Sequence, residues 1–150
     1  MNLSRIFTKL NGPIAWVLRS PLHSLLDPGL MLVTVTGRKT GKRYTIPVGY
    51  QRDGDRFVVL VSRARTKTWW RNYRDPGPIE VYTRGAEHAG TARLVAPESQ
   101  DFLRAFEVTF DQMPWLSPQF GVRHERGRKL DSKQHETLAQ EAAVIRIDLT

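Results

Sequence analysis

The sequence predicts a mainly β domain, a small barrel of about six antiparallel strands with flanking helices. Short β-branched runs such as residues 30–36 alternate with turn residues, as all-β proteins require. Asp53 and Gly54 form a strong hairpin signal between two such runs. One late run, residues 142–149, returns after a helical excursion, which favours a barrel. The chain has 150 residues, of which 40% are hydrophobic, and no linker or repeat, so residues 1–150 are expected to form a single domain.

The individual elements follow from periodicity and turn residues. Residues 4–26 place apolar side chains at helical spacing, with a break near Pro13, and predict an N-terminal helical segment. In the strand expected at 43–51, Pro47 indicates a sheet edge or a bulge. The remaining expected elements are strands at 30–36, 56–63, 79–84, 90–96 and 142–149, a loop or short helix at 64–77, helices at 97–110 and 132–141, and a loop at 113–130.

Several classes of site are excluded or disfavoured. The chain has no cysteine, so disulfides, thiolate metal sites and cysteine nucleophiles are excluded. No run reaches the ~18–20 apolar residues that span a bilayer. The apolar stretch in residues 1–26 is broken and does not read as a secretory signal, so we expect a cytoplasmic protein. No metal site is expected, because no metal-ligand spacing links the four histidines: His23, His88, His124 and His135.

Positive charge is concentrated in one part of the chain. Residues 38–74 contain eleven basic and two acidic residues, a net charge of +9, whereas the whole chain carries +8. Because the excess is local, it predicts a surface for an anionic partner. Basic residues among aromatics also suit nucleic acid, but no nucleic-acid motif is present, and that interpretation is disfavoured.

The turn between the first two strands is the strongest candidate for the anion site. Its glycines, Gly37 and Gly41, allow backbone N–H groups to converge on an anion. Arg38, Lys39 and Arg43 add charge and hydrogen-bond donors. The turn therefore predicts phosphate binding; the alternative is a solvated basic hairpin loop.

Two adjacent tryptophans, Trp69 and Trp70, lie among cations such as Lys67 and Arg71. One of them could stack on the planar ring of a ligand while the cations bind the anionic tail of that ligand. The alternative is that both plug the open end of the barrel.

Four short segments occur in an order typical of one family: the turn at 36–41 followed by Pro47, the hairpin at 53–55, Ser62, and residues 69–72. Together they resemble the deazaflavin (F420)-dependent nitroreductase family of the flavin/deazaflavin oxidoreductase superfamily. The similarity covers about residues 20–95, and the last third matches poorly.

The resemblance implies a split β-barrel that binds F420, with FMN as the second choice, and passes hydride to a small electron-poor acceptor: a nitroaromatic, a quinone or an activated alkene. It also implies a homodimer by analogy. Proton-donor candidates are Tyr44, Ser62 and Tyr73. The expected cofactor-binding residues, from the resemblance and the charge map, are Gly37, Arg38, Lys39, Thr40, Gly41, Arg43, Pro47, Ser62, Arg63, Lys67, Trp69, Trp70 and Asn72.

The chain departs from the nitroreductase pattern at two places. The arginine expected five residues after the turn lysine is replaced by Tyr44, and the arginine is Arg43, one residue earlier. A one-residue shift turns a side chain to the other sheet face, so either the strand is bulged or that contact is lost. No tyrosine follows Tyr82, which leaves the acceptor open. The alternative function is a non-catalytic lipid- or fatty-acid-binding member of the superfamily that lies on the inner face of an anionic membrane through residues 1–26.

Overall fold

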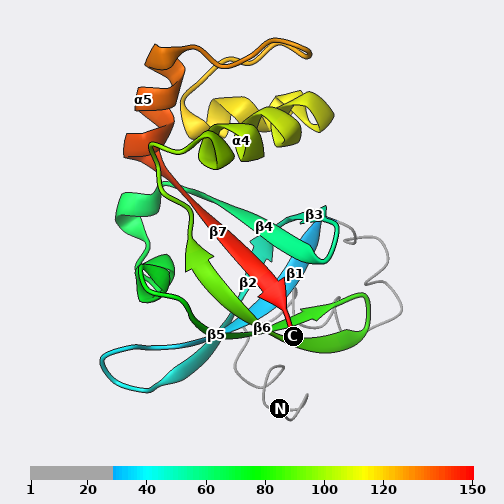
Figure 1. Ribbon diagram of the computed structural model, residues 1–150, viewed down its shortest axis with the longest axis vertical. Coiled ribbons are helices and arrows are strands. Elements are labelled where there is room, and N and C mark those ends of the chain that lie inside the picture. The colour runs from blue at the N-terminus through cyan, green and yellow to red at the C-terminus, as the bar shows by residue number, and fades with distance from the viewer. Residues whose placement is uncertain (1–28) are drawn as a thin grey trace.

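The computed structural model describes residues 29–150, so the helical segment expected at 4–26 lies outside the described residues. The described chain forms one antiparallel sheet with two α-helices beyond one of its ends (Figure 1). The strands, in sheet order, are β2 (Arg43–Gly49), β1 (Leu30–Thr36), β5 (Gly77–Thr83), β6 (Ala86–Leu94), β7 (Ala142–Leu149), β4 (Arg56–Ser62) and β3 (Gln51–Asp53).

The sheet must curl into a barrel because the chain passes directly from one edge strand of the sheet to the other. β2 and β3 are the first and last strands in the sheet order, yet only Tyr50 separates them in the sequence. The Tyr50 side chain is buried, with its hydroxyl 3.0 Å from the Thr83 hydroxyl and its ring packed edge-on against Phe57. The mainly β, split-barrel prediction is confirmed, and the strand expected at 43–51 is divided at this residue.

The residue types in the strands explain how the strands pack. β4 is apolar on both faces: Phe57, Val59 and Val61 enter the barrel core, while Val58 and Leu60 pack beneath the helices. A strand that is covered on both sides reads as a continuous hydrophobic run. β6 and β7 approach so closely at Gly90 that a Cβ there would lie 2.7 Å from the Asp148 carbonyl oxygen, which requires glycine.

Most other elements lie near their expected places. Pro47 pairs regularly with Leu32 in β2, an edge strand without a bulge. The hairpin between β5 and β6 is tighter than expected, because residues 86–89 are strand and only Arg84 and Gly85 form the turn. The segment at 64–77 contains two short 3₁₀ helices, η1 (Ala64–Thr66) and η2 (Trp69–Tyr73).

The helical cap consists of α4 (Gln100–Gln112), the 3₁₀ helix η3 (Pro114–Phe120) and α5 (Ser132–Glu141). Ser99 caps α4, and a reciprocal capping box of Asp131 and Gln134 begins α5. The expected loop at 113–130 thus contains η3. A second core, with Phe102, Phe106 and Phe110 fully buried, joins the cap to β4 and β7.

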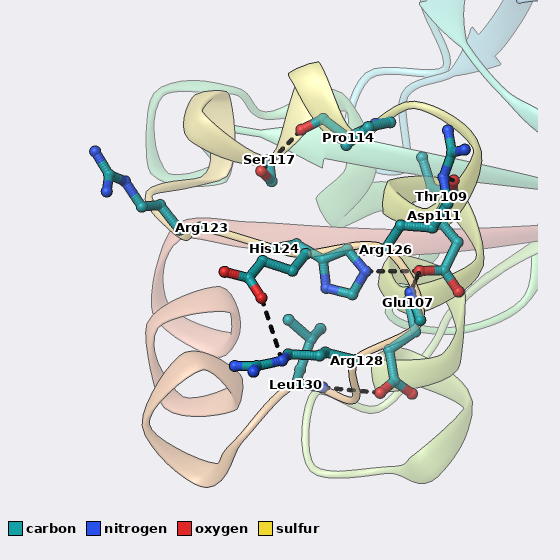
Figure 2. Close-up of polar contacts among 12 residues, drawn as sticks. Glu107, Thr109, Asp111, Pro114, Ser117, Arg123, His124, Arg126, Arg128 and Leu130 are labelled. Carbon is teal, nitrogen blue, oxygen red and sulfur yellow. Dashed lines mark hydrogen bonds and ion pairs between the residues drawn. The ribbon is translucent and has the colours of Figure 1, made fainter.

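Polar contacts fasten the loop after η3 onto α4 (Figure 2). The Asp111 carboxylate oxygen lies 2.7 Å from His124 Nε2 and accepts the Gly127 N–H at 3.0 Å. Glu107 accepts the Leu130 N–H at 2.9 Å. The His124 side chain is only 1% exposed. These contacts hold the loop between η3 and α5 against α4, the helix that covers the sheet.

Candidate cofactor and acceptor site

A cleft of about 580 Å³ opens where the curled sheet does not close, between β2 and β4. Residues 46–51 and 58–62 line its sheet side, with Lys67 and Trp69 beside them. Its other wall comes from the cap: Thr109, Met113, Leu116, Gln119 and Phe120. The volume lies within the range of about 300–1,000 Å³ that is usual for small-molecule sites.

Four of the expected cofactor-binding residues meet in this cleft: Pro47, Ser62, Lys67 and Trp69. The Lys67 ammonium donates to the Ser62 carbonyl at 2.7 Å and lies 3.4 Å from the Ser62 hydroxyl oxygen. Lys67 is the one charged residue among the described residues that line this mostly apolar cleft. Ser62 is also the proton-donor candidate that the structure places there.

The basic turn lies at the other end of β2. Its backbone is closed by hydrogen bonds from Gly37 N to Lys42 O at 2.8 Å and from Gly41 N to Gly37 O at 2.9 Å. Gly41 has φ of +69°, a conformation that side-chain-bearing residues rarely adopt. Residues 38–42 are exposed, and no hydrogen bond or ion pair within the described chain engages the ammonium groups of Lys39 and Lys42.

Asn72 ties this turn to η2. Its side-chain oxygen accepts the Arg38 N–H at 3.0 Å, and its amide nitrogen donates to the Trp69 carbonyl at 2.9 Å. The same nitrogen lies 3.4 Å from the Tyr44 hydroxyl. Asn72 therefore fixes the turn relative to the segment that supplies Trp69 to the cleft.

The sequence left open whether β2 is bulged at Arg43 and Tyr44, where the chain departs from the nitroreductase pattern, and the register of β2 shows that it is regular there. Thr36 pairs with Arg43 and Val35 with Tyr44, with no bulge. Arg43 forms an ion pair with Glu80, whereas Tyr44 packs against the barrel core. Burial raises the pKa of Tyr44, partly offset by the hydrogen bond from Asn72. Arg43 is therefore held on the opposite face of the strand from Tyr44.

Other predicted residues have local roles outside the cleft. Tyr73 is buried, its hydroxyl donates to the Pro78 carbonyl at 3.0 Å, and burial raises its pKa strongly. Trp70 donates to the Ala64 carbonyl at 2.8 Å and is covered by the guanidinium groups of Arg71 and Arg74. Trp70 thus stacks on the chain's own cations.

Arg63 has an unusual backbone. It adopts a left-handed conformation with φ of 50° directly after β4 and begins η1. Such a conformation in a non-glycine residue costs of order 1–3 kcal/mol and is often found at functional sites. Its carbonyl accepts from the backbone and hydroxyl of Thr66, which hold the turn beside Ser62 and Lys67.

Among residues 29–150, no group of three or more histidine or carboxylate side chains could hold a metal ion. In the same range no helix is long and apolar enough to cross a membrane.

The comparison with known families identifies one family. The family model described as F420H(2)-dependent quinone reductase matches residues 17–125. The chain belongs to this family. The resemblance predicted from the turn, the hairpin and the tryptophan segment is thereby confirmed, and the family is named for the reduced cofactor F420H2.

Curated relatives include an F420H(2)-dependent quinone reductase of Mycobacterium tuberculosis. It is 27% identical over 84 residues, which cover 54% of this chain and 56% of the relative. The chain thus spans about half the length of the curated relatives that it matches.

Solved structures show the same fold. An F420-H2 dependent reductase, FDR-A, has a TM-score of 0.55 at 15% identity and covers 81% of this chain and 95% of its own. The heme storage protein HutZ from Vibrio cholerae has a TM-score of 0.54 at 9% identity, covering 83% and 84%. At these identities the likeness establishes the barrel alone.

The residues present fit a cofactor of F420's chemistry, an anionic tail on a planar ring. The exposed turn cations suit a polyanion, and the cleft offers an indole beside polar groups. Pro47 lies four positions along β2 from Arg43, a distance of roughly 13 Å in a strand, so an elongated molecule would be needed to reach both the turn and the cleft.

Proposed function

We propose that this protein is an F420-dependent reductase that delivers hydride to a quinone-like, apolar, electron-poor acceptor. The observation that carries the proposal is the placement of two complementary sites along β2. At one end, the turn holds Lys39 and Lys42, whose ammonium groups have no partner in the described chain, and at the other the mostly apolar cleft with Ser62 and Lys67 opens. Membership of the F420H(2)-dependent quinone reductase family supports it.

The turn holds the anionic tail of the cofactor. Lys39 and Lys42 are exposed, and their ammonium groups form no hydrogen bond or ion pair within the described chain. Gly41 lets the backbone approach an anion closely. Asn72 keeps the turn in register with η2 through the Arg38 N–H and the Trp69 carbonyl. The turn is thus preorganised for its ligand.

F420H2, when bound, supplies the hydride, and the protein supplies position and charge. The Trp69 ring forms part of the cleft wall against which a planar ring can pack. The Lys67 ammonium, beside the Ser62 hydroxyl, can stabilise negative charge that develops on an acceptor oxygen. Ser62 then donates a proton to that oxygen and is reprotonated through Lys67.

The cap wall holds the acceptor. Met113, Leu116 and Phe120 offer apolar surface without a charged group, which suits an electron-poor ring and keeps water away from it. This wall belongs to the part of the chain that departs from the nitroreductase pattern, so it is the wall that selects among acceptors.

The direct test is a titration of the full-length protein with F420, followed by tryptophan fluorescence at several salt concentrations. Binding should quench emission and weaken as salt rises, because the turn contacts are exposed charge pairs. Lys39→Gln should raise the Kd about tenfold, as expected for the loss of one charge-assisted contact. Lys133→Gln, at an exposed position of α5, is the matched control and should leave Kd unchanged.

Catalysis is tested with F420H2 and the soluble quinone menadione. Turnover that requires both, and that falls in Ser62→Ala while F420 affinity is kept, supports the assignment. Absence of F420 binding at low salt, or binding that Lys39→Gln does not alter, would reject it.

A second candidate function is a non-catalytic lipid- or fatty-acid-binding member of the superfamily. The observation that favours it is that Arg43 is engaged by Glu80 and that Tyr44 stands in the family's arginine position. Such a protein would bind a fatty acid in the cleft, would not bind F420, and would sediment with anionic vesicles through residues 1–26.

We propose a cytoplasmic homodimer as the working form. One similar solved structure, with a TM-score of 0.57 at 16% identity, is described as a domain-swapped dimer. Light scattering of the purified full chain tests the proposed dimer, and a monomer at micromolar concentration would reject it.

A further inference from the structure

A second cavity, of about 280 Å³, lies on the cap side of the sheet, where α4 covers β4 and β7. It is separate from the cleft that holds Ser62 and Lys67, but Gln51, Val58 and Thr109 line both and form a common wall. None of the roles proposed for the cleft uses its remaining residues.

The floor of this cavity is apolar. Val58 and Val144 come from the sheet, Val95 from the chain that follows β6, and Ala105 from α4. Val108, at the lip, is 42% exposed, and within residues 29–150 it is one of two exposed large hydrophobic side chains. A concave apolar floor with an exposed apolar lip can bury a hydrocarbon or aromatic body.

The rim of the cavity is rich in guanidinium groups. Arg52, Arg56, Arg104 and Arg146 line it, against the carboxylates of Asp53 and Asp101. Neighbouring Asp148 contacts both Arg56, at 3.7 Å, and Arg146, at 3.2 Å. Arg52 donates from its Nε to the Gly54 carbonyl at 3.2 Å, and its guanidinium carbon lies 5.7 Å from the centre of the Phe57 ring. Arg104 is exposed and makes no hydrogen bond or ion pair within residues 29–150.

The strand register adds a further cation on the same face. Arg93 in β6 lies directly opposite Arg146 in β7. Residues that face each other across an antiparallel pair point to the same side, and like charges there repel. With Asp148 shared between Arg56 and Arg146, the patch retains excess positive charge, which an anion would relieve.

We propose that this cavity is a binding site for a small carboxylic acid with an apolar body. The body would lie on Val58, Val95 and Val144, and the carboxylate would accept from the guanidinium groups of Arg104 and Arg52, which have donors to spare. Its volume lies just below the range of about 300–1,000 Å³ for drug-sized ligands, so the ligand is small. Lys39, Ser62 and Lys67, which are proposed to act on the cofactor and the acceptor, do not line this cavity.

Octanoate and octanol form a matched pair of probes, because they share the apolar body and differ in charge. Each is titrated into full-length protein whose valine and leucine methyl groups are labelled for NMR. Octanoate should shift the methyl signals of Val95, Val108 and Val144 while those of Val48 and Leu116 in the cleft stay in place. Octanol should bind at least threefold more weakly.

Arg104→Gln tests the charge contact without disturbing a packed group, and it should raise the Kd for octanoate about threefold to tenfold. Arg52→Gln should act in the same direction. Arg123→Gln is the control, since that side chain points away from the other residues drawn in Figure 2 and does not line the cavity. Equal binding of octanol, shifts confined to the cleft, or no octanoate binding at millimolar concentration would overturn the proposal.

Discussion

The two walls of the cleft are built in different ways. The sheet wall, from β2, β4 and the η1–η2 segment, carries the charged Lys67 beside Ser62, and hydrogen bonds of Asn72 and Lys67 hold this wall together. The cap wall, from α4 and η3, contributes Met113, Leu116 and Phe120 and is held by a separate aromatic core. The difference implies a division of labour, in which the sheet wall recognises an anionic cofactor and the cap wall selects the acceptor.

Removing a large side chain from the aromatic core of the cap should have the largest effect on this division of roles between the two walls. Phe106 is fully buried and packs edge-on against Phe102 and Phe120. Phe106→Ala should lower the free energy of unfolding by about 3–5 kcal/mol, because it removes apolar contacts and leaves a cavity. Urea denaturation measures this loss.

The matched variant Phe106→Leu should cost less, since it keeps most of the volume. If the two walls are separable, folded Phe106→Ala at low temperature should still bind F420 with near wild-type affinity while its KM for menadione rises. An equal loss of F420 affinity would show that the cap also shapes the cofactor site.

The reverse perturbation acts on the sheet wall. Asn72→Ala removes the acceptor of the Arg38 N–H and the donor to the Trp69 carbonyl. We expect a loss of about 1–3 kcal/mol in F420 binding, because the turn is no longer fixed to η2. Calorimetry measures it. Asp75→Asn, which affects only the exposed ion pair with Arg38, is the control and should change affinity little. Comparable losses in both variants would contradict the assigned role of Asn72.

The sequence could predict much of the sheet wall because its signals are local. The glycines and cations of the turn, the Asp53-Gly54 hairpin and the apolar β4 run are all contiguous in sequence. Pro47 correctly marked an edge strand for the same reason. Residue roles were harder to assign: the regular register that turns Arg43 toward Glu80 depends on strand pairing, which a single strand does not reveal.

The cap wall could not be predicted from local signals. Thr109, Met113 and Leu116 are ordinary residues in a helix and a proline-rich segment, and they become a site wall only when the aromatic core places them over β4. The sequence predicted a helix at 97–110 but not which side of it would face the opening. The division of β2 from β3 at Tyr50, which closes the barrel, likewise follows from tertiary packing against Phe57 and Thr83.

A milder change sharpens the role of the cap in acceptor choice. Leu116 lines the cleft, whereas its neighbour Trp115 is 67% exposed and does not. Leu116→Ala should raise the KM for an apolar quinone about threefold to tenfold, as expected for losing a partly buried side chain from an apolar pocket, with the Kd for F420 unchanged. Steady-state kinetics at saturating F420H2 measure it. Trp115→Ala should alter neither constant; a larger effect there would move the acceptor to the outer face of η3.

The smallest effect concerns the contact that closes the cap, His124 with Asp111 (Figure 2). The hydrogen bond from His124, helped by the Gly127 N–H, lowers the pKa of Asp111 below its ordinary value of 3.8. A carboxyl group with a lowered folded-state pKa stabilises the fold above its unfolded pKa, and this stabilisation is lost as pH falls through the folded value. Wild-type protein should therefore melt at a higher temperature than Asp111→Asn at neutral pH, and the difference should shrink once the pH drops below 3.8. Asp101→Asn, exposed on the same helix, should show no such convergence. Melting curves that stay a constant distance apart down to strongly acidic pH would mean that the carboxylate of Asp111 is not what fastens the loop to α4.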